Sequence, residues 1–211
     1  MSLEVNIDLG AELTPFEADD PKNYIRINTR RALKKIGNLY IKVMRDEQLS
    51  GRKADGTGLE ARTGELRKRK NFKVDVTSDK TGASLTVTVG KGLKYTNLQE
   101  KGGKITAKNA KFLAIPLDDP LVRNNRGQQR YKSPRDVPGK LFVVESERGA
   151  LFLARDDGRR GLKLLYILKK SVVIPARLGA KAVARGETSN FRKDAIKILE
   201  GLKTKIEKKF K

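Results

Sequence analysis

Few residues in this sequence have the types and spacing that catalysis needs. The chain contains no His and no Cys, which removes histidine bases, Ser-His-Asp and Cys-His nucleophile systems, and zinc sites built from Cys and His. The acidic pairs Asp118-Asp119 and Asp156-Asp157 stand beside a proline or a glycine, as carboxylates in solvated turns do. A two-metal nuclease site would instead need carboxylates that converge from separate elements. We therefore expect a non-enzymatic protein with no catalytic residue, metal site, cofactor or small-molecule substrate.

Two glycine-rich segments raise the question of a phosphate-binding loop. Gly56-Thr57-Gly58 and Gly90-Lys91-Gly92 each place two glycines around one residue. Neither segment has the full spacing of a nucleotide-binding loop, and neither clearly joins a strand to a helix. We interpret both as turns.

Basic side chains are the strongest chemical signal in the sequence. Lys and Arg number 47 against 25 Asp and Glu, so the formal net charge is +22. Such an excess indicates an acidic partner: nucleic acid, an acidic protein surface or anionic lipid. One basic cluster flanks a predicted strand, and a second fills a predicted loop. The candidate contacts with DNA or an acidic partner are Arg67, Lys68, Arg69, Lys70, Arg123, Arg126, Arg130, Lys132 and Arg135.

A third basic cluster lies on the predicted C-terminal helix, at Lys203, Lys205, Lys208, Lys209 and Lys211. Any single cluster has an alternative interpretation as a solvated face that gives solubility. Phosphate contacts by Lys and Arg need no sequence code and weaken with salt. Aromatic residues make up 6% of the chain, so contact with the phosphate backbone is favoured over base stacking on a single-strand platform.

The sequence gives no sign of membrane insertion or secretion. No apolar run reaches the length of about 18 residues that a membrane-spanning helix needs. The first ten residues carry Glu4 and Asp8 and no basic residue, unlike a secretory signal. We expect the chain to stay in the cytoplasm of the cell that makes it, with no membrane partner.

The elements that position these residues follow from hydrophobic periodicity. Residues 1–19 are acidic and are interpreted as an arm or an edge strand. Asp20 and Pro21 suit the N-cap and the first position of a helix. An apolar stripe at helical spacing continues that helix until Ser50-Gly51.

From residue 72 the apolar period changes to two, which predicts strands. Residues 72–76 and 85–89 alternate as an antiparallel hairpin with one buried face. A single helical turn is expected at 95–100. Further short strands are predicted at residues 104–106, 112–115, 141–145, 150–154, 164–168 and 172–174. Exposed loops are expected at 118–138 and 155–163, and a second apolar stripe predicts a C-terminal helix that Ser189 or Asn190 can cap.

The order of helix, antiparallel strands and helix indicates an α+β fold, with a mostly antiparallel sheet packed against a long N-terminal helix and a C-terminal helix. We divide the chain into an arm at 1–19, an α+β core domain at 20–188 that carries the exposed basic loop 118–138, and a Lys-rich amphipathic helix at 189–211.

Three separated blocks are more specific than composition. The sequence reads YTNLQEKGGKI at 95–105, KNAKFLAIPL at 108–117 and LKKSVVIPAR at 168–177, with ARTGEL earlier at 61–66. These blocks resemble the virion morphogenesis, or tail-completion, family of long-tailed bacteriophages. In that family a Y-x-x-x-x-E-x-G-G-x-I turn precedes a K-N-A-K-x-L-x-I-P strand, and a K-x-V-x-I-P-A-R strand leads into the last helix. The matching motif residues here are Tyr95, Glu100, Gly102, Gly103, Asn109, Pro116, Pro175 and Arg177.

The resemblance implies a structural virion protein of the head–tail junction, acting in the neck, in tail completion or as a tail terminator. It implies a homo-oligomeric ring around the DNA channel, expected to be a hexamer, that contacts neighbouring neck and tail-tube proteins and touches phage DNA without sequence specificity. The protein would assemble in the host cytoplasm and end in the virion. One departure is that the family often continues P-A-R-P-F-L, whereas Leu178-Gly179 follows Arg177 here. The net charge leaves an alternative open, a free non-specific nucleic-acid-binding protein.

Overall fold

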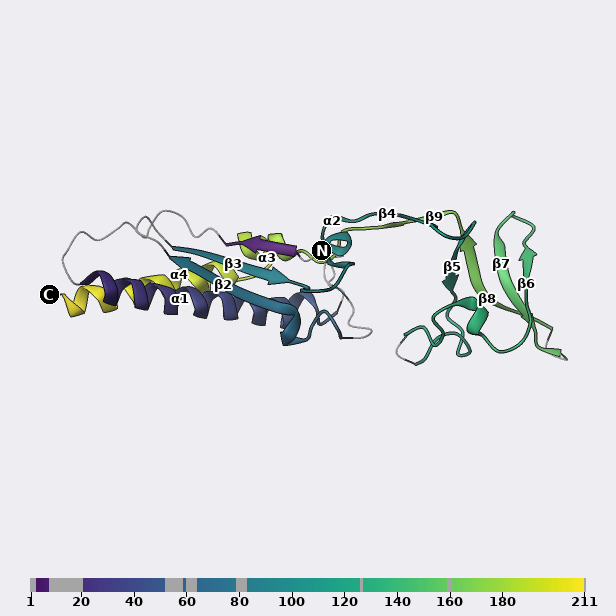
Figure 1. Ribbon diagram of the computed structural model, residues 1–211, viewed down its shortest axis with the longest axis horizontal. Helices are drawn as coiled ribbons and strands as arrows, with labels where there is room; N and C mark the ends of the chain where they lie inside the picture. The colour runs from purple at the N-terminus through teal and green to yellow at the C-terminus, as the bar shows by residue number, and fades with distance from the viewer. Residues whose placement is uncertain are drawn as a thin grey trace. The chain divides into compact units, whose positions relative to one another are not determined.

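The computed structural model describes residues 3–7, 21–51, 59, 64–78, 83–125, 127–158 and 161–210. The chain forms two compact units, drawn in Figure 1. The first unit contains Met1–Gly102 and Ala176–Lys211, and the second contains Gly103–Pro175. Helices and antiparallel sheets occur together, so the predicted α+β class is confirmed.

The first unit is built on an antiparallel sheet with the strand order β1-β3-β2. Its strands are β1 (Leu3–Asn6), β2 (Phe72–Ser78) and β3 (Ala83–Val89). Val89 of β3 stands opposite both Leu3 and Phe72, and directly opposed residues share a face of a sheet. Alternate residues of each strand therefore point to the same face of the sheet, and opposed apolar residues line up across the three strands on the buried face. The predicted hairpin and the N-terminal edge strand are both confirmed.

Three helices pack with this sheet. They are α1 (Pro21–Val43), α3 (Ala180–Arg185) and α4 (Phe191–Lys209). Helix α1 lies against β2 and β3, and α4 runs beside α1. The two long helices are antiparallel, because Tyr24 stacks edge-on against Phe210 at one end and Tyr40 against Phe191 at the other.

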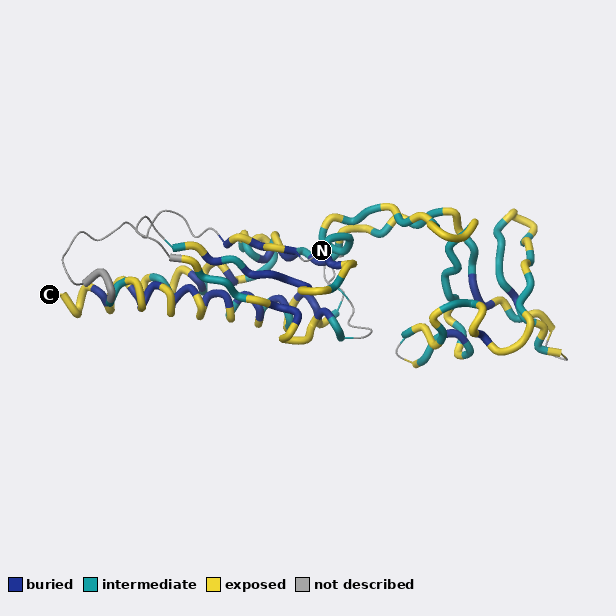
Figure 2. Tube along the Cα trace, in the orientation of Figure 1, coloured by how far each residue is buried: buried dark blue, intermediate teal, exposed yellow. Residues whose placement is uncertain are grey.

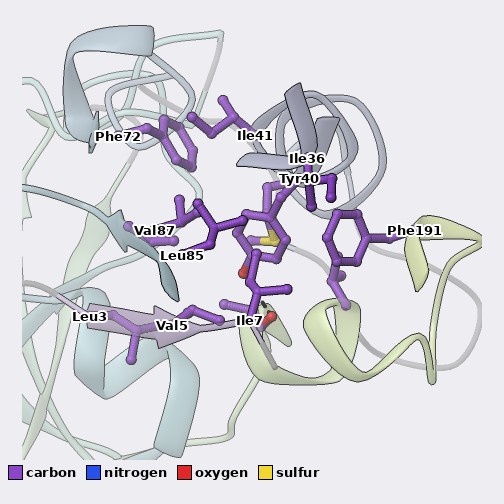
Figure 3. Packing of buried hydrophobic residues seen from close by; sticks show 14 of the residues in the cluster. Leu3, Val5, Ile7, Ile36, Tyr40, Ile41, Phe72, Leu85, Val87 and Phe191 are labelled. Atoms are coloured by element: carbon purple, nitrogen blue, oxygen red, sulfur yellow. Dashed lines mark hydrogen bonds between the residues drawn. The ribbon is translucent and has the colours of Figure 1, made fainter. Parts of the chain in front are cut away.

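One apolar core joins the helices to the sheet, as Figure 3 shows. Ile36 and Tyr40 of α1 are fully buried in it, facing Val87 of β3 and Phe191 of α4. Helix α1 approaches β2 closely at Gly37, where an added Cβ would lie 2.6 Å from the Cγ1 of Val74. A glycine at this position lets helix and strand pack at short range.

The ends of the helices are close to the predicted ones. After α1 the chain continues in a π-helical turn, η1 (Met44–Gln48), so the helical path ends two residues before the predicted stop at Ser50-Gly51. The predicted N-cap Asp20 lies outside the described residues. Of the two predicted caps of α4, Asn190 stands at the N-cap position, but its side chain accepts no capping hydrogen bond. The hydroxyl of Ser189 accepts the amide of Phe191 at 3.3 Å.

The second unit contains a two-stranded ribbon and a four-stranded antiparallel sheet with the order β5-β8-β7-β6. The ribbon pairs β4 (Gly103–Thr106) with β9 (Ser171–Ile174). The sheet strands are β5 (Leu113–Pro116), β6 (Leu141–Glu145), β7 (Leu151–Asp156) and β8 (Leu162–Lys169). Each predicted strand of this region is present, with ends within two residues of the prediction.

The segment 118–138 is not the projecting loop that its composition predicts. Val122 and Val137 are buried and pack against Leu165 and Tyr166 of β8. A short 3-10 turn, η3 (Pro134–Asp136), closes the segment with a reciprocal capping box between Ser133 and Asp136. Leu121 and Tyr131 of the same segment are partly buried against this cluster. Such scattered apolar residues carry no periodic signal.

The two units divide the chain differently from the predicted segments. The segment 20–188, expected to be one core domain, contributes to both units. Helix α4, which was placed in a segment of its own at 189–211, joins the core of the first unit through Phe191 and Ala195, as expected for a C-terminal helix that packs with the sheet. The N-terminal arm places Leu3 and Val5 in the same core, while its residues 8–19 lie outside the described part of the chain.

Candidate nucleic-acid interface

The first predicted basic cluster, Arg67 to Lys70, is an exposed surface whose charge is partly neutralised. The Nη2 atom of Arg67 lies 3.7 Å from the Oδ1 atom of Asp46. Lys68 pairs with Glu65, and this hydrogen bond is the main reason why the pKa of Glu65 lies below its usual value. Two of the four cations in the cluster therefore face carboxylates of the same unit.

The remaining contacts tie this cluster to α1. Arg69, in the 3-10 turn η2 (Arg69–Asn71), donates to the Oδ1 atom of Asn38 at 3.1 Å and to the carbonyl of Phe72 at 3.2 Å. Arg45 donates from Nε to the carbonyl of Arg67 at 2.9 Å. The cluster is thus part of the packing between the end of α1 and the start of β2.

Arg123, in the second predicted cluster, serves the local fold. Its Nε atom donates to the carbonyls of Pro116 and Leu117 at 3.3 and 3.1 Å, its Nη2 to Pro116 at 2.9 Å, and its Nη1 to Gly127 at 2.7 Å. A guanidinium that satisfies three backbone carbonyls has few donors left for a phosphate. The expectation that Arg123 projects freely is therefore corrected.

The other basic residues of this segment have different surroundings. Arg130 is exposed, and its Nε atom donates to the carbonyl of Arg123 at 3.1 Å. Lys132 and Arg135 are exposed, so they stay available to an anionic partner. Arg126 lies outside the described residues.

The third predicted cluster lies on α4. Lys203, Lys205, Lys208 and Lys209 are all exposed, and Lys211 lies outside the described residues. The Nζ atom of Lys205 donates to the Oδ1 atom of Asn28 in α1 at 3.3 Å. This contact places one cation of α4 directly beside α1.

A further basic surface, which the sequence analysis did not single out, lies on α1 itself. The helix contains seven Lys or Arg residues and no Asp or Glu. The apolar stripe predicts only which side of α1 is buried. The signal for its basic side is the absence of acidic residues from the whole helix. The exposed cations are Arg26, Arg30, Arg31, Lys34, Lys35 and Lys42.

Five of these residues, Arg30, Arg31, Lys34, Lys35 and Lys42, are here called the α1 cationic surface. At 100° per residue Arg31, Lys34, Lys35 and Lys42 fall on the side of the helix away from the buried stripe, and Arg30 lies at the border of the stripe. Figure 2 shows exposed residues recurring along α1. Within the described part of the chain, none of the five lies within ion-pair distance of a carboxylate. The described carboxylates of the first unit therefore leave the charge of this surface unpaired.

Two of the motif blocks, 95–105 and 168–177, meet in the structure. Strand β4 pairs with β9 from Gly103 opposite Ile174 to Thr106 opposite Ser171. Just before β4, the carbonyl of Gln99 accepts the amides of Arg177 and Leu178 at 2.8 and 2.9 Å. Backbone hydrogen bonds thus join segments that are about seventy residues apart in the sequence.

Glu100 is the motif residue with the most specific contacts. It lies in helix α2 (Thr96–Lys101). Its two carboxylate oxygens accept the amides of Ala180 and Lys181 at 2.8 and 3.0 Å. These amides belong to the first turn of α3, where backbone donors lack partners within the helix. Glu100 therefore caps a helix that begins eighty residues later in the chain.

The other motif residues form turns and strand ends. Gly102 has a φ of 70° and Gly103 a φ of 156°, which favour glycine at the turn from α2 into β4. Pro116 is the last residue of β5, and Pro175 follows β9 directly, as expected for a residue that cannot donate to a ladder. Tyr95 and Asn109 are exposed, and the described residues give them no contact that explains the motif.

The residues weighed for catalysis do not converge. Among the described residues, no three acidic side chains gather where they could hold a metal ion. Asp119 pairs with Lys163 at 3.3 Å, and Asp157 with Arg155 at 2.9 Å. Gly90 lies in a turn with a φ of 69°, while the segment 56–58 lies outside the described part of the chain.

No helix among the described residues is both long enough and apolar enough to span a bilayer. No family model, curated protein or solved structure matches the chain.

Proposed function

We propose that this protein is a structural component of the head–tail junction of a long-tailed bacteriophage, acting in the neck, in tail completion or as a tail terminator. The observation that carries the proposal is the meeting of the motif blocks 95–105 and 168–177. Strand pairing of β4 with β9, the two amides bound to Gln99 and the Glu100 cap all use residues of these blocks. The resemblance to the tail-completion family rests on the same two blocks. Its motif residues therefore include residues that are in contact in the folded chain.

The proposal includes a closed homo-oligomeric ring, with six subunits as the specific expectation. Neighbouring neck and tail-tube proteins are its proposed partners, and the virion is its final location. Cyclic rings are built from heterologous contacts, in which one surface of a subunit meets a different surface of the next. Short exposed strands such as β9, where Val173 is 73% exposed, offer apolar area for such contacts.

Electron microscopy tests this function directly. Phage particles from the cell that encodes the chain are labelled with an antibody against the purified protein and imaged. We expect label at the head–tail junction, and rings of uniform diameter in negative-stain images of the purified protein. Label found only in the lysate, never on particles, would show that the protein is not a virion component.

A second candidate function is non-specific binding of nucleic acid by the free protein. The α1 cationic surface favours it, since its five exposed cations, which pair with no described carboxylate, can contact the phosphates of a duplex. A duplex-binding titration of the purified protein separates the two functions. Tight binding by the monomer near physiological salt supports the second, whereas binding that appears only in the oligomer supports the first.

A further inference from the structure

Helix α1 carries positive side chains and no negative one along its exposed side. Arg30 and Lys34 are four residues apart, as are Arg31 and Lys35, so each pair places two cations one above the other on the helix surface. From Arg30 to Lys42 the surface extends about 18 Å along the helix axis. No acidic residue occurs anywhere in Pro21–Val43.

This arrangement disfavours the isolated helix. Like charges at a spacing of four residues destabilise a helix by roughly 0.2–0.5 kcal/mol per pair. The neighbouring helix adds a further cation, because Lys205 of α4 donates to Asn28. In the described part of the first unit, no carboxylate lies within ion-pair distance of the surface. An external polyanion would remove the repulsion.

The partner that fits is the backbone of duplex nucleic acid. A duplex carries one negative charge per about 1.7 Å of its axis, so a surface of this length faces on the order of ten phosphates. A single strand would need aromatic platforms, and all the exposed residues of α1 between Arg26 and Lys42 are basic apart from Ile27 and Asn38. A membrane-surface helix needs a free apolar face, but the apolar face of α1 is buried in the core of its own unit.

We propose that the α1 cationic surface binds the phosphate backbone of duplex DNA without sequence preference. The inference deepens the second candidate function, contact with nucleic acid, and rests on it. It differs from the sequence-based expectation, which placed the DNA contact at Arg67–Lys70 or in the segment 118–138. DNA binding at α1 is compatible with a ring as well as with a free protein.

The test measures binding of the full-length protein to two fluorescent duplexes of about 20 base pairs and unrelated sequence, by anisotropy, between 50 and 200 mM NaCl. Five phosphate contacts give a slope of log Kobs against log salt of about −4.5. We therefore expect the affinity to fall about 500-fold over this range, equally for both duplexes. Unequal affinities that persist at high salt would contradict a contact made with phosphates alone.

Two charge-matched variants locate the site. The first, Arg30→Gln/Arg31→Gln/Lys34→Gln/Lys35→Gln, should reduce the slope by about 3.6, since each lost phosphate contact accounts for about 0.9. The control, Lys104→Gln/Lys140→Gln/Arg148→Gln/Lys170→Gln, removes four exposed cations of the second unit and should change the slope by less than one. Circular dichroism and a thermal melt confirm that both variants fold.

The outcomes are distinct. If both variants weaken binding equally, net charge rather than α1 binds the duplex, and the proposal fails. If a third variant, Arg130→Gln/Lys132→Gln/Arg135→Gln, loses the binding and the α1 variant does not, the site is in the second unit. If the α1 variant loses binding to phosphatidylserine vesicles but not to DNA, the partner is a membrane. If the wild type binds no duplex at all, the second candidate function fails with the inference, whereas imaging of virions still decides the first.

Discussion

At the scale of single residues, Glu100 shows how one side chain can hold two distant segments. Its carboxylate accepts the amides of Ala180 and Lys181, at the start of α3. The carbonyl of Ala180 in turn accepts the hydroxyl of Tyr40 at 2.7 Å. The amide of Ala180 is therefore bound by α2 and its carbonyl by α1. These two hydrogen bonds fix the position at which the chain returns to the core of the first unit.

Replacement of Glu100 by Ala should destabilise the first unit. Two amides at the start of α3 would lose their acceptor, and an unsatisfied buried polar group costs about 1–3 kcal/mol. Glu100→Gln keeps one acceptor oxygen and should cost less. Urea unfolding followed by circular dichroism measures both free energies. A loss below about 0.5 kcal/mol for Glu100→Ala would mean that water replaces the carboxylate and that the cap is not structural.

The buried hydroxyl of Tyr40 should make the free energy of unfolding decrease at alkaline pH. Burial, and to a lesser degree the charge of Glu100, raises the pKa of its hydroxyl far above the ordinary value of 10.0. The unfolded chain therefore loses this proton first, so the stabilisation is complete below about pH 10 and falls as the pH rises further, by about 1.4 kcal/mol per pH unit.

Tyr40→Phe isolates this effect. At pH 7 the variant should lose about 1–2 kcal/mol, because the carbonyl of Ala180 would no longer receive its hydrogen bond. Above pH 10 its stability should decline less steeply than that of the wild type. Urea midpoints measured from pH 8 to 11 give both curves. Parallel curves would show that lysine deprotonation, rather than Tyr40, controls the alkaline limit.

The role of a side chain could not be predicted from the sequence where its partner lies far away along the chain. Glu100 was marked by its motif, but no local pattern names Ala180 as its partner, because the contact exists only once α2 and α3 are folded. Arg123 shows the opposite case. The polar composition of the segment 118–138 predicted that Arg123 is an exposed cation. Its guanidinium instead donates to three backbone carbonyls near it in the sequence. An arginine that faces solvent and one that completes a turn have the same local sequence.

At the scale of elements, periodicity predicted the strands and both long helices well. The alternation at 72–76 and 85–89 follows from one buried face of a sheet, and the register confirms it. The segment 118–138 was predicted less well, because it is held by Val122 and Val137 rather than by a periodic pattern. The basic side of α1 was not predicted, although the sequence carries a signal for it in the absence of Asp and Glu from the helix.

The close approach of α1 to β2 gives a prediction that opposes helix propensity. Gly37→Ala should gain about 1 kcal/mol as a helix residue. The added methyl, however, would lie 2.6 Å from the Cγ1 of Val74 and 3.2 Å from the Cδ1 of Leu85. A valine has little freedom to move aside, and such overpacking costs about 1–3 kcal/mol. We expect a net loss of stability in urea unfolding.

Gly201 of α4 provides the matched control. It is an exposed glycine inside a helix, and an added Cβ there meets nothing within 4 Å. Gly201→Ala should therefore stabilise the protein by up to about 1 kcal/mol. A stabilising effect of Gly37→Ala as well would mean that α1 can shift away from β2 without loss. Addition of Val74→Ala to Gly37→Ala should recover part of the lost stability if the contact with Val74 is its cause.

At the scale of the whole molecule, the chain leaves the first unit once and returns once. It passes into the second unit between Gly102 and Gly103 and returns between Pro175 and Ala176. The two crossings are adjacent, because Gly103 stands opposite Ile174 in the β4–β9 ribbon. The described members of each hydrophobic cluster come from one unit alone. The second unit thus has the form of an insertion with its own core.

This organisation predicts that the first unit folds without the second. Residues 103–175 are replaced by a Gly-Ser linker of two to four residues, which is long enough because opposed residues of an antiparallel pair lie about 5 Å apart. Gln99 and Glu100 remain to bind residues 177–181, so the return of the chain stays fixed. We expect a dispersed two-dimensional NMR spectrum and a cooperative thermal transition.

Glu100→Ala in this shortened chain should lower the transition temperature, as we expect in the full chain. A shortened chain that is unfolded, while the full chain is stable, would show that the first unit depends on the second and that the two cores are one folding unit.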